Sequence, residues 1–550
     1  MHKKLFRSVK TILTASLVVI FCTFGISSAT AATAVWSLPG AVLAQGGFGG
    51  VYIPHVVFDS SGNATALWAS NDGSTVHIQS ATRPAGGSWS APETVFSVPN
   101  SDGGVFGSIS TGVSSSGNIE AVWTAFVNGY ANQLVYSSSK PFGGSWSTPV
   151  ALNYAISPAS NAVISVDANG NATAVWLVTN ATLGGRGQVQ SSSKPANGSW
   201  SLSVPLSDVM TSSAMAPIRI VTDSSGTSTA VWAQYNMLAT TTEAVVVSKS
   251  VNGSWGLLVG TPTVLDTDPS GIFAPALAVS SNGKVTALWS TGSVSTVRAA
   301  DLPLGGSWSS PVTVATLAFN AFDTVTSVDP AGNVAAVWRT YTNNNGGGTV
   351  LQAVTRPVGG AWTAAVDVSS PNPNGINDPQ IVSDALGNVT ALWSTSNLIG
   401  EGIVLTATMP AGGSWGTVTD LTQTPSHTPV PVSTSIAVAP SGNLLAAFSI
   451  TDAQSIAYVI VVDAVVPTPA PTPTPTPTPS SAGAGSTPSA SATPTQTTSV
   501  SAASSTPLAY TGFSVNAPLI FFGVFALTAG AGLVVFVLIR NRILRKKQID

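Results

Sequence analysis

Hydrophobic and polar residues alternate in short runs through the middle of the chain, from residue 33 to residue 466. Typical runs, rich in Val, Thr or Trp and bounded by Gly or Pro, are residues 379–384, 388–393 and 403–408. A fourth run begins at Trp415, directly after a Gly-Gly pair. Alternation with a period of two between turn residues is typical of half-buried β-strands. The pattern predicts four strands in this unit.

The unit repeats because two short motifs alternate along the same stretch. The first motif reads Asp-x-x-Gly-Asn-x-x-Ala-Val-Trp, and its last position is Trp68, Trp123, Trp176, Trp232, Trp289, Trp338, Trp393 or Phe448. The second reads Arg/Lys-Pro-x-Gly-Gly-Ser-Trp-Ser-x-Pro, and its tryptophans are Trp89, Trp146, Trp200, Trp255, Trp308, Trp362 and Trp415. The period is roughly 54 residues, a length at which propellers and solenoids are expected. Four strands per unit favour an all-β, eight-bladed β-propeller.

The two ends of the repeat array predict how the ring closes. The last unit has three strands, ending near Val462, and lacks the strand that would follow a second motif. A stretch of the missing kind lies at the other end, around Trp36. If it completes the last blade, two open sheet edges are removed. An open β-solenoid is the alternative, and it would not need this extra strand.

The repeated residues themselves have structural roles. Asp at the start of a turn accepts backbone hydrogen bonds, Gly supplies the positive φ, and Trp fills the space between blades. A calcium loop is the alternative for Asp167 to Asn171, but the sister turns carry Ser or Pro where ligands would be needed, so we expect no metal. The turn resembles the Asp-box of sialidase-like propellers in kind of fold, although the Asp-to-Trp offset in that family is shorter.

The connections that hold candidate ligand residues lie at one end of the predicted ring. The two motif turns hardly vary in length, whereas the other connections do, and variable loops on a rigid scaffold commonly carry function. Tyrosines gather there, and three inner strands have a polar residue four positions before the turn. The candidate ligand-binding residues are Tyr52, His55, Tyr130, Tyr154, Arg219, Tyr235, Arg339, Tyr341 and Gln380. Aromatic and amide side chains suit sugar rings, although such residues also decorate ordinary solvent-exposed loops.

Charge and motif content narrow the classes of function. Between residues 32 and 539 the chain has 10 Lys and Arg against 21 Asp and Glu, a net charge of −11, which would repel nucleic acid. The three histidines of this part show no metal-ligand spacing, and neither a nucleophile motif nor a carboxylate pair stands out. We therefore expect no cofactor and no catalysis, with a glycan-active, sialidase-like hydrolase as the alternative.

The N-terminus predicts export. Basic residues precede an apolar run from Thr11 to Ile26, and small residues follow it up to Ala31, as in a signal peptide cleaved after Ala31. A membrane anchor is the alternative. The single cysteine, Cys22, lies inside residues 1–31, so the exported chain would contain no disulfide.

The C-terminus has three features in order. Leu-Ala-Tyr-Thr-Gly at 508–512 precedes an uncharged apolar segment at 517–539, long enough for a transmembrane helix, and a basic tail at 540–550. Together they resemble the cell-wall sorting signal of sortase substrates, in the LAxTG form used by class E sortases of actinobacteria. The resemblance implies that a sortase cleaves between Thr511 and Gly512 and joins Thr511 to peptidoglycan. Ala509 stands where the commoner motif has Pro, so the class of sortase is less well defined by the motif than the cleavage reaction is. A single-pass membrane protein is the alternative.

Residues 467–507 are rich in Pro, Thr and Ser and predict an extended linker that cannot bury a core. We expect an extracellular, wall-anchored protein that is a single-pass membrane form before sortase acts. The predicted function is adhesin-like binding of a glycan or a protein. The alternatives are the wall-anchored hydrolase and a purely structural surface protein.

Overall fold

The computed structural model describes residues 34–466, except 47–49, 130–131, 154–157, 181–183, 210, 256–261, 343–347, 398–400, 423–432 and 453. The predicted signal peptide, linker, transmembrane helix and basic tail, together with Thr511 and Gly512, lie outside the described residues. Within the described part, no helix is long and apolar enough to span a bilayer.

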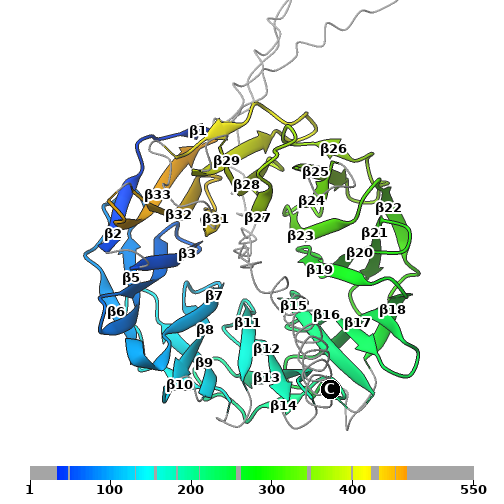
Figure 1. The fold of residues 1–550 in the computed structure, drawn as a ribbon, viewed down its shortest axis with the longest axis horizontal. Helices are drawn as coiled ribbons and strands as arrows, with labels where there is room; N and C mark the ends of the chain where they lie inside the picture. Colours follow the sequence, from blue (N-terminus) through cyan, green and yellow to red (C-terminus); the bar gives the residue numbers. More distant parts are fainter. Residues whose placement is uncertain are drawn as a thin grey trace, which may run out of the picture.

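The described strands form eight antiparallel sheets arranged around a central axis, so the chain is an eight-bladed β-propeller, as predicted (Figure 1). Blades 1 and 2 contain β3 (Val51–Phe58), β4 (Ala64–Asn71), β5 (Thr75–Arg83) and β6 (Glu93–Pro99), then, after the 3-10 turn η1 (Asn100–Asp102), β7 (Val105–Val113), β8 (Ile119–Val127), β9 (Asn132–Lys140) and β10 (Val150–Ala151). Blades 3 and 4 contain β11 (Ala159–Val166), β12 (Ala172–Asn180), β13 (Arg186–Lys194), β14 (Val204–Pro205), β15 (Ser212–Thr222), β16 (Ser228–Asn236), β17 (Thr241–Lys249) and β18 (Thr263–Asp268).

The remaining four blades follow the same order from the axis outward. Blades 5 and 6 contain β19 (Ile272–Val279), β20 (Val285–Thr291), β21 (Thr296–Leu302), β22 (Val312–Thr316), β23 (Ala321–Val328), β24 (Val334–Tyr341), β25 (Thr349–Arg356) and β26 (Val366–Asp367). Blades 7 and 8 contain β27 (Ile376–Ser383), β28 (Val389–Ser396), β29 (Gly402–Met409), β30 (Thr419–Asp420), β31 (Thr434–Val438), β32 (Leu444–Thr451), β33 (Ala457–Val465), β1 (Val35–Trp36) and β2 (Ala41–Gly46).

The predicted closure of the ring is confirmed. β1 and β2 both pair with β33, so the N-terminal segment supplies the outer strand of blade 8 in two pieces. Trp36 lies opposite Ala464 in this pairing. Across the same seam, both guanidinium Nη atoms of Arg83 in blade 1 donate to the carboxylate of Asp463 in blade 8, at 2.6 and 2.5 Å.

One strand boundary differs from the prediction. The outer strand of blade 7 was expected to begin at Trp415, but β30 begins at Thr419. A backbone hydrogen bond from Gly416 N to Thr408 O joins the segment to β29 before the regular ladder starts. Trp415 therefore lies in the segment between the Gly-Gly turn and β30, where it packs against the hydrophobic cluster shared by blades 6 and 7.

The first-motif tryptophans form the contacts between blades, as predicted. All seven are fully buried, with Phe448 in the eighth place. Trp68 of blade 1, for example, shares a hydrophobic cluster with Leu445 and Ala447 of blade 8. Burying a side chain of this size stabilises each blade–blade contact by about 3 kcal/mol.

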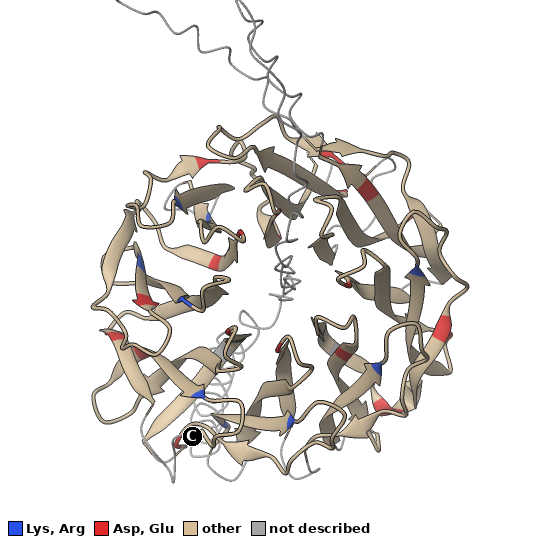
Figure 2. Ribbon diagram, turned by 180° about the vertical axis from the view of Figure 1, so that it is seen from behind, with Lys and Arg blue, Asp and Glu red and all other residues tan. Residues whose placement is uncertain are grey.

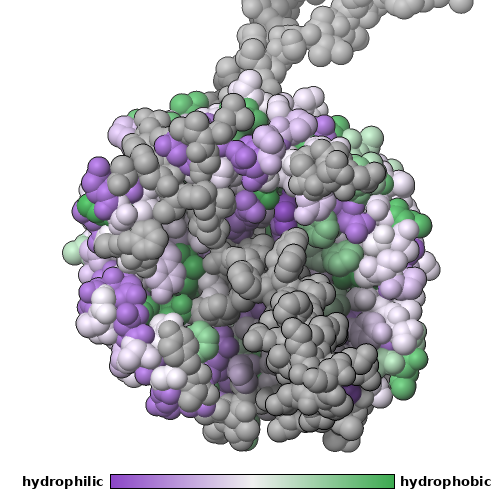
Figure 3. Space-filling model, in the orientation of Figure 1, coloured by the Kyte–Doolittle hydropathy of each residue, from purple (hydrophilic) through white to green (hydrophobic). Residues whose placement is uncertain are grey.

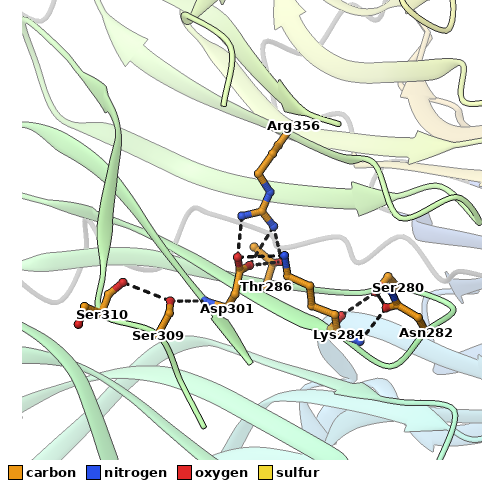
Figure 4. A network of polar contacts seen from close by, with 8 residues as sticks. All are labelled: Ser280, Asn282, Lys284, Thr286, Asp301, Ser309, Ser310 and Arg356. Carbon is orange, nitrogen blue, oxygen red and sulfur yellow. Dashed lines mark hydrogen bonds and ion pairs between the residues drawn. The ribbon is translucent and has the colours of Figure 1, made fainter. Parts of the chain in front are cut away.

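The second-motif cations add ion pairs between blades. Arg356 of blade 6 donates to both carboxylate oxygens of Asp301 in blade 5, each at 2.9 Å, and Lys284 also contacts Asp301 (Figure 4). The same guanidinium lies 4.6 Å from the ring centroid of Trp362. Lys194 of blade 3 likewise contacts Glu120 of blade 2. Charged residues are few and scattered around the ring, and most described cations are paired in this way (Figure 2).

The repeated turns define one end of the ring, which we call the hairpin face. Asp59 Oδ1 accepts hydrogen bonds from the backbone N–H groups of Ser61 and Asn63, which closes the turn between the first two strands. Asn63 Oδ1 then accepts one from Ala85 N in the Gly-Gly hairpin. The same hydrogen bond, between the Asn side chain of the first turn and the backbone of the Gly-Gly hairpin, recurs in four other blades. Both motif turns therefore lie at this end of the ring.

The opposite end, which we call the loop face, carries the connections of variable length. Because neighbouring strands are antiparallel, the connections from second to third strand and from one blade to the next must lie there. β33 runs from the loop face toward the hairpin face, so Val465 and Val466 lead the chain out of the ring on the hairpin side.

Candidate functional site

A bulge recurs at the same place in the inner strands, which are the strands nearest the axis of the ring (Figure 1). The register slips by extra residues in β3, β7, β11, β15, β19, β23 and β27. At five of these slips a residue other than Gly has a φ of 46 to 53°, namely Ile53, Asn161, Ala274, Asp323 and Asp378. A bulge redirects the side chain it carries. In blades 6 and 7 that side chain is a carboxylate.

Asp378, in β27, is held in the wall between blades 7 and 8. Its Oδ2 accepts hydrogen bonds from the backbone N–H and the hydroxyl of Thr434, at 2.8 and 3.1 Å, and its Oδ1 accepts one from Gln380 Nε2 at 3.1 Å. Burial, together with a smaller effect of the Asp323 charge, raises the pKa of Asp378 to about 7. Near neutral pH this carboxyl therefore exists in both protonation states.

Asp323, in β23, has a different environment. Its carboxylate forms an ion pair with Arg339 Nε in the neighbouring strand β24. The Arg339 guanidinium lies 5.5 Å from the centroid of Phe322, within the range of a cation–π contact. Phe322 meets Tyr341 edge-on at 5.6 Å between centroids and Phe273 of blade 5 at 5.8 Å. An ion pair and three aromatic rings thus form one cluster.

Arg219, in β15 of blade 4, completes the charged group. Its side chain is buried and donates one hydrogen bond, from Nη1 to the Ile218 carbonyl at 3.0 Å. Burial lowers its pKa to about 10, while the charges of Asp323 and Asp378 oppose that change. These carboxylates belong to blades 6 and 7, and neither forms a hydrogen bond or an ion pair with Arg219 among the described residues. We call Arg219, Phe322, Asp323, Arg339, Tyr341 and Asp378 the channel-mouth cluster.

The structure brings four of the predicted site residues to this cluster: Arg219, Arg339, Tyr341 and Gln380. His55 lies elsewhere, since its Nε2 is 2.9 Å from the hydroxyl of Thr111 in the next inner strand, and its Nδ1 has no partner among the described atoms. Burial lowers the pKa of His55 to about 4, so the ring is neutral. His55 therefore joins blades 1 and 2.

The tyrosines divide in the same way. Tyr341 ends β24 beside Phe322, whereas Tyr235, which is 40% exposed, lies near the end of β16. Tyr52 packs on the hydrophobic cluster between blades 1 and 2, and burial raises its pKa to about 12. Tyr130 and Tyr154 lie outside the described residues.

Hollows open on both faces of the described part of the ring. A hollow of about 620 Å³ on the loop face lies between blades 5 and 6 and includes Phe319, Thr340, Tyr341 and Asp367 in its lining. A larger one, about 840 Å³, lies on the hairpin face and is lined by turn residues such as Asp223. The Asp223 carboxylate accepts hydrogen bonds from Ser225 and Thr227 of its own turn. The smaller hollow shares Tyr341 with the channel-mouth cluster, so the loop face carries the stronger candidate.

Phe322, Asp323 and Asp378 were not singled out from the sequence. A signal was present, because two aspartates six positions before the turn residue interrupt otherwise apolar inner strands in a chain with only 7% charged residues. The alternating pattern gave no sign of the bulge that redirects them.

The described residues hold no group of three or more His, Cys, Asp or Glu arranged as metal ligands. The turn considered for calcium is closed by its own hydrogen bonds. Asp167 Oδ1 accepts from the N–H groups of Asn169 and Asn171, and Oδ2 accepts from Asn171 Nδ2 at 2.7 Å. Such bonds account for the Asp that five of the eight repeats have at this position.

No protein-family model matches the chain, and no curated protein matches it. Among solved structures, a protein of unknown function from Dyadobacter fermentans has 13% identity and a TM-score of 0.36, over 70% of this chain and 99% of that chain. A Hadza microbial sialidase has 9% identity and a TM-score of 0.35, over 66% and 90%. A polysaccharide lyase has 8% identity and a TM-score of 0.42, over 78% and 91%. Likeness at this level carries no information about the chemistry of this chain.

Proposed function

We propose that the chain is a cell-surface binding protein that is anchored to the wall by its C-terminus and recognises an extracellular ligand at the loop face. The observation that carries the binding proposal is the channel-mouth cluster. It combines an ion pair and half-buried aromatic rings on blade 6 with buried charged side chains on the inner strands of blades 4 and 7, in an otherwise sparsely charged chain.

The path of the chain supports this orientation. The ring ends with β33 on the hairpin face, so the linker starts on the side opposite the channel-mouth cluster. The linker of residues 467–507 would extend to roughly 120 Å at about 3.1 Å per residue. A chain attached at Thr511 would then hold the loop face toward the surroundings of the cell.

The chemistry of the cluster favours a glycan as the ligand. The carbon-bound hydrogens of a sugar ring pack against aromatic faces, and its hydroxyls bond to carboxylates, amides and guanidinium groups. Phe322 and Tyr341 offer the first kind of contact, and Asp323, Gln380 and Arg219 the second. On the face seen in Figure 3, the described residues around the ring mix hydrophobic and hydrophilic side chains.

One observation favours an enzyme as the second candidate. Asp323 and Asp378 lie on the inner strands of neighbouring blades, and burial raises the pKa of Asp378, as for the acid in carboxylate pairs that cleave glycosidic bonds. Both oxygens of Asp378, however, already accept hydrogen bonds in the wall. Binding without turnover is therefore the first candidate.

The binding proposal is tested with the full chain, purified in detergent and applied to a glycan array and to chromogenic glycosides. We expect array binding that Tyr341→Ala weakens at least about tenfold. Phe142→Ala, which removes an exposed aromatic ring from the hairpin face, should leave it unchanged. Turnover of a glycoside would favour the enzyme. No binding on the array and no turnover would reject the binding proposal and the enzyme alike.

The anchoring proposal is tested in the producing cells. We expect the full chain to stay with the wall and to be released by a muramidase. Thr511→Ala should shift it to the membrane fraction, whereas Thr506→Ala, a change in the linker, should not. Equal fractionation of both variants would contradict sortase attachment.

A further inference from the structure

Three aromatic side chains fill the seam between blades 1 and 2 beside the first-motif tryptophan. Phe96 of the outer strand β6 lies 5.5 Å from Trp123 and 4.6 Å from Tyr136 of blade 2, measured between ring centroids. Trp123 and Tyr136 are opposite each other in the pairing of β8 with β9. The outer strand of one blade and the middle strands of the next therefore close this seam together.

The seam between blades 4 and 5 has an ion pair in the same place. Asp266 of β18 accepts hydrogen bonds from Trp289 Nε1 at 2.8 Å and from Arg298 Nη1 at 2.6 Å. The strand pairing gives Asp266 and Arg298 the same positions relative to the tryptophan as the two other rings have in the first seam. Charged side chains thus replace aromatic ones as the filling.

The seam between blades 5 and 6 lacks both kinds of filling. The equivalent residues beside Trp338 are Ala315 of β22 and Gln352 of β25. Both line the hollow of about 620 Å³ on the loop face. Because the alanine side chain is a single methyl group, the space that a phenyl ring fills elsewhere stays open. The volume of the hollow is in the range of small-molecule sites in proteins.

The polar groups of this hollow are oriented from the interior of the blade. The buried Trp338 Nε1 donates to Gln352 Oε1 at 3.3 Å, and Gln352 Nε2 donates to Asp367 Oδ1 at 2.9 Å. The second amide hydrogen of Gln352 and the Oδ2 atom of Asp367 make no hydrogen bond among the described residues. A donor and an acceptor are therefore available side by side and held in place, as a binding site requires.

The lining favours an uncharged sugar unit. Phe319 and Tyr341 are half-buried and offer ring surface to the carbon-bound hydrogens of a sugar. A donor beside an acceptor matches two adjacent hydroxyls, because each hydroxyl can donate and accept. None of the described lining residues is Lys or Arg, and the exposed carboxylate of Asp367 would repel that of an acidic sugar.

We propose that the hollow between blades 5 and 6 binds an uncharged sugar unit, whose adjacent hydroxyls bond to Gln352 and Asp367. This inference rests on the proposed glycan-binding function and names the class of sugar. Tyr341 belongs both to the hollow and to the channel-mouth cluster, so a glycan of two or more units would contact both.

The test fills the hollow with the residues of the seam between blades 1 and 2. The full chain, purified in detergent, is titrated by calorimetry with cellotriose, mannotriose, triacetylchitotriose and trigalacturonate. We expect at least one neutral trisaccharide to bind at least about tenfold more tightly than trigalacturonate. The double variant Ala315→Phe, Gln352→Tyr should weaken that binding at least about tenfold while its melting temperature stays at or above that of wild type.

A matched pair of single variants gives a second measurement. Asp367→Ala should weaken binding about three- to tenfold, the effect of one lost hydrogen bond. Asp420 of blade 7 has the same place in its outer strand, opposite Leu405 as Asp367 is opposite Gln352. Asp420→Ala should therefore bind like wild type.

The outcomes separate this inference from the proposed function. If the double variant and Asp367→Ala bind like wild type while Tyr341→Ala does not, the hollow is not the site and glycan binding at the channel mouth stands. The inference is also overturned if none of the neutral trisaccharides binds or if trigalacturonate binds most tightly. If no glycan binds on the array either, both proposals fail. If the double variant melts below wild type, equal affinities of Asp367→Ala and Asp420→Ala overturn the inference.

Discussion

Two buried groups in the channel wall should oppose one another in their effect on stability as pH changes. Asp378 has a folded-state pKa of about 7 against an ordinary value of 3.8, because burial disfavours its charge. Between these values the folded chain holds a proton that the unfolded chain releases, so stability falls as pH rises. His55 has a folded-state pKa of about 4 against 6.5. The unfolded chain holds the proton in that window, so stability rises with pH.

The size of each effect follows from the pKa values. Each pH unit inside a window changes the free energy of unfolding by about 1.4 kcal/mol. Between pH 4.5 and 6.5 the two groups act over nearly the same range, and each changes the free energy of unfolding by about 2 kcal/mol, with opposite sign. In the wild-type chain these changes nearly cancel.

Replacing either residue alone should reveal how the other makes the free energy of unfolding depend on pH. In Asp378→Asn only His55 titrates, so the free energy of unfolding should rise by about 2 kcal/mol from pH 4.5 to 6.5. In His55→Gln only Asp378 titrates, so it should fall by about 2 kcal/mol over the same range. Urea unfolding followed by tryptophan fluorescence measures both. The double variant is the control, since it should return to the wild-type slope even if its baseline stability is lower. Parallel slopes in all four proteins would refute the reasoning.

Three further changes test the fold. Deleting residues 34–46 removes the strands paired with β33 and should cost roughly 5 kcal/mol or more, at about 1 kcal/mol per lost backbone hydrogen bond, with oligomers forming at the open edge on size-exclusion chromatography. Trp176→Ala should cost about 3–5 kcal/mol in chemical unfolding because the residue is fully buried, and the half-buried Trp200→Ala should cost clearly less. Asp167→Ala should cost about 1–2 kcal/mol by the same measurement, since three hydrogen bonds of the turn end on that carboxylate. Equal costs for the two tryptophans, a monomeric deletion variant, or an unchanged Asp167→Ala protein would each contradict the role assigned.

Most of the fold could be predicted from the sequence because the motifs that indicate it are short and recur from blade to blade. Tryptophans at a fixed offset from an Asp-Gly turn indicate a four-stranded unit, and the surplus strand near Trp36 indicates closure. The boundary at Trp415 was misjudged because an aromatic residue after a Gly pair also suits a strand.

The candidate site was predicted only in part. Arg219, Arg339, Tyr341 and Gln380 stood out by residue type and place in the repeat. Asp323 and Asp378 depend on bulges, which insert residues without disturbing the surrounding alternation. Their partners come from other strands and blades, as with Thr434, which lies 56 positions from Asp378. Such contacts cannot be read from one segment of sequence.

The central claim is that the loop face binds the ligand while the hairpin face is turned toward the anchor. Hydrogen–deuterium exchange of the full chain, with and without the tightest glycan from the array, tests it most directly. Protection should concentrate in residues 212–222, 321–342 and 376–383, which contain the channel-mouth cluster. Protection confined to the turns at 59–63 and 84–90 and their counterparts in the other blades would contradict the account.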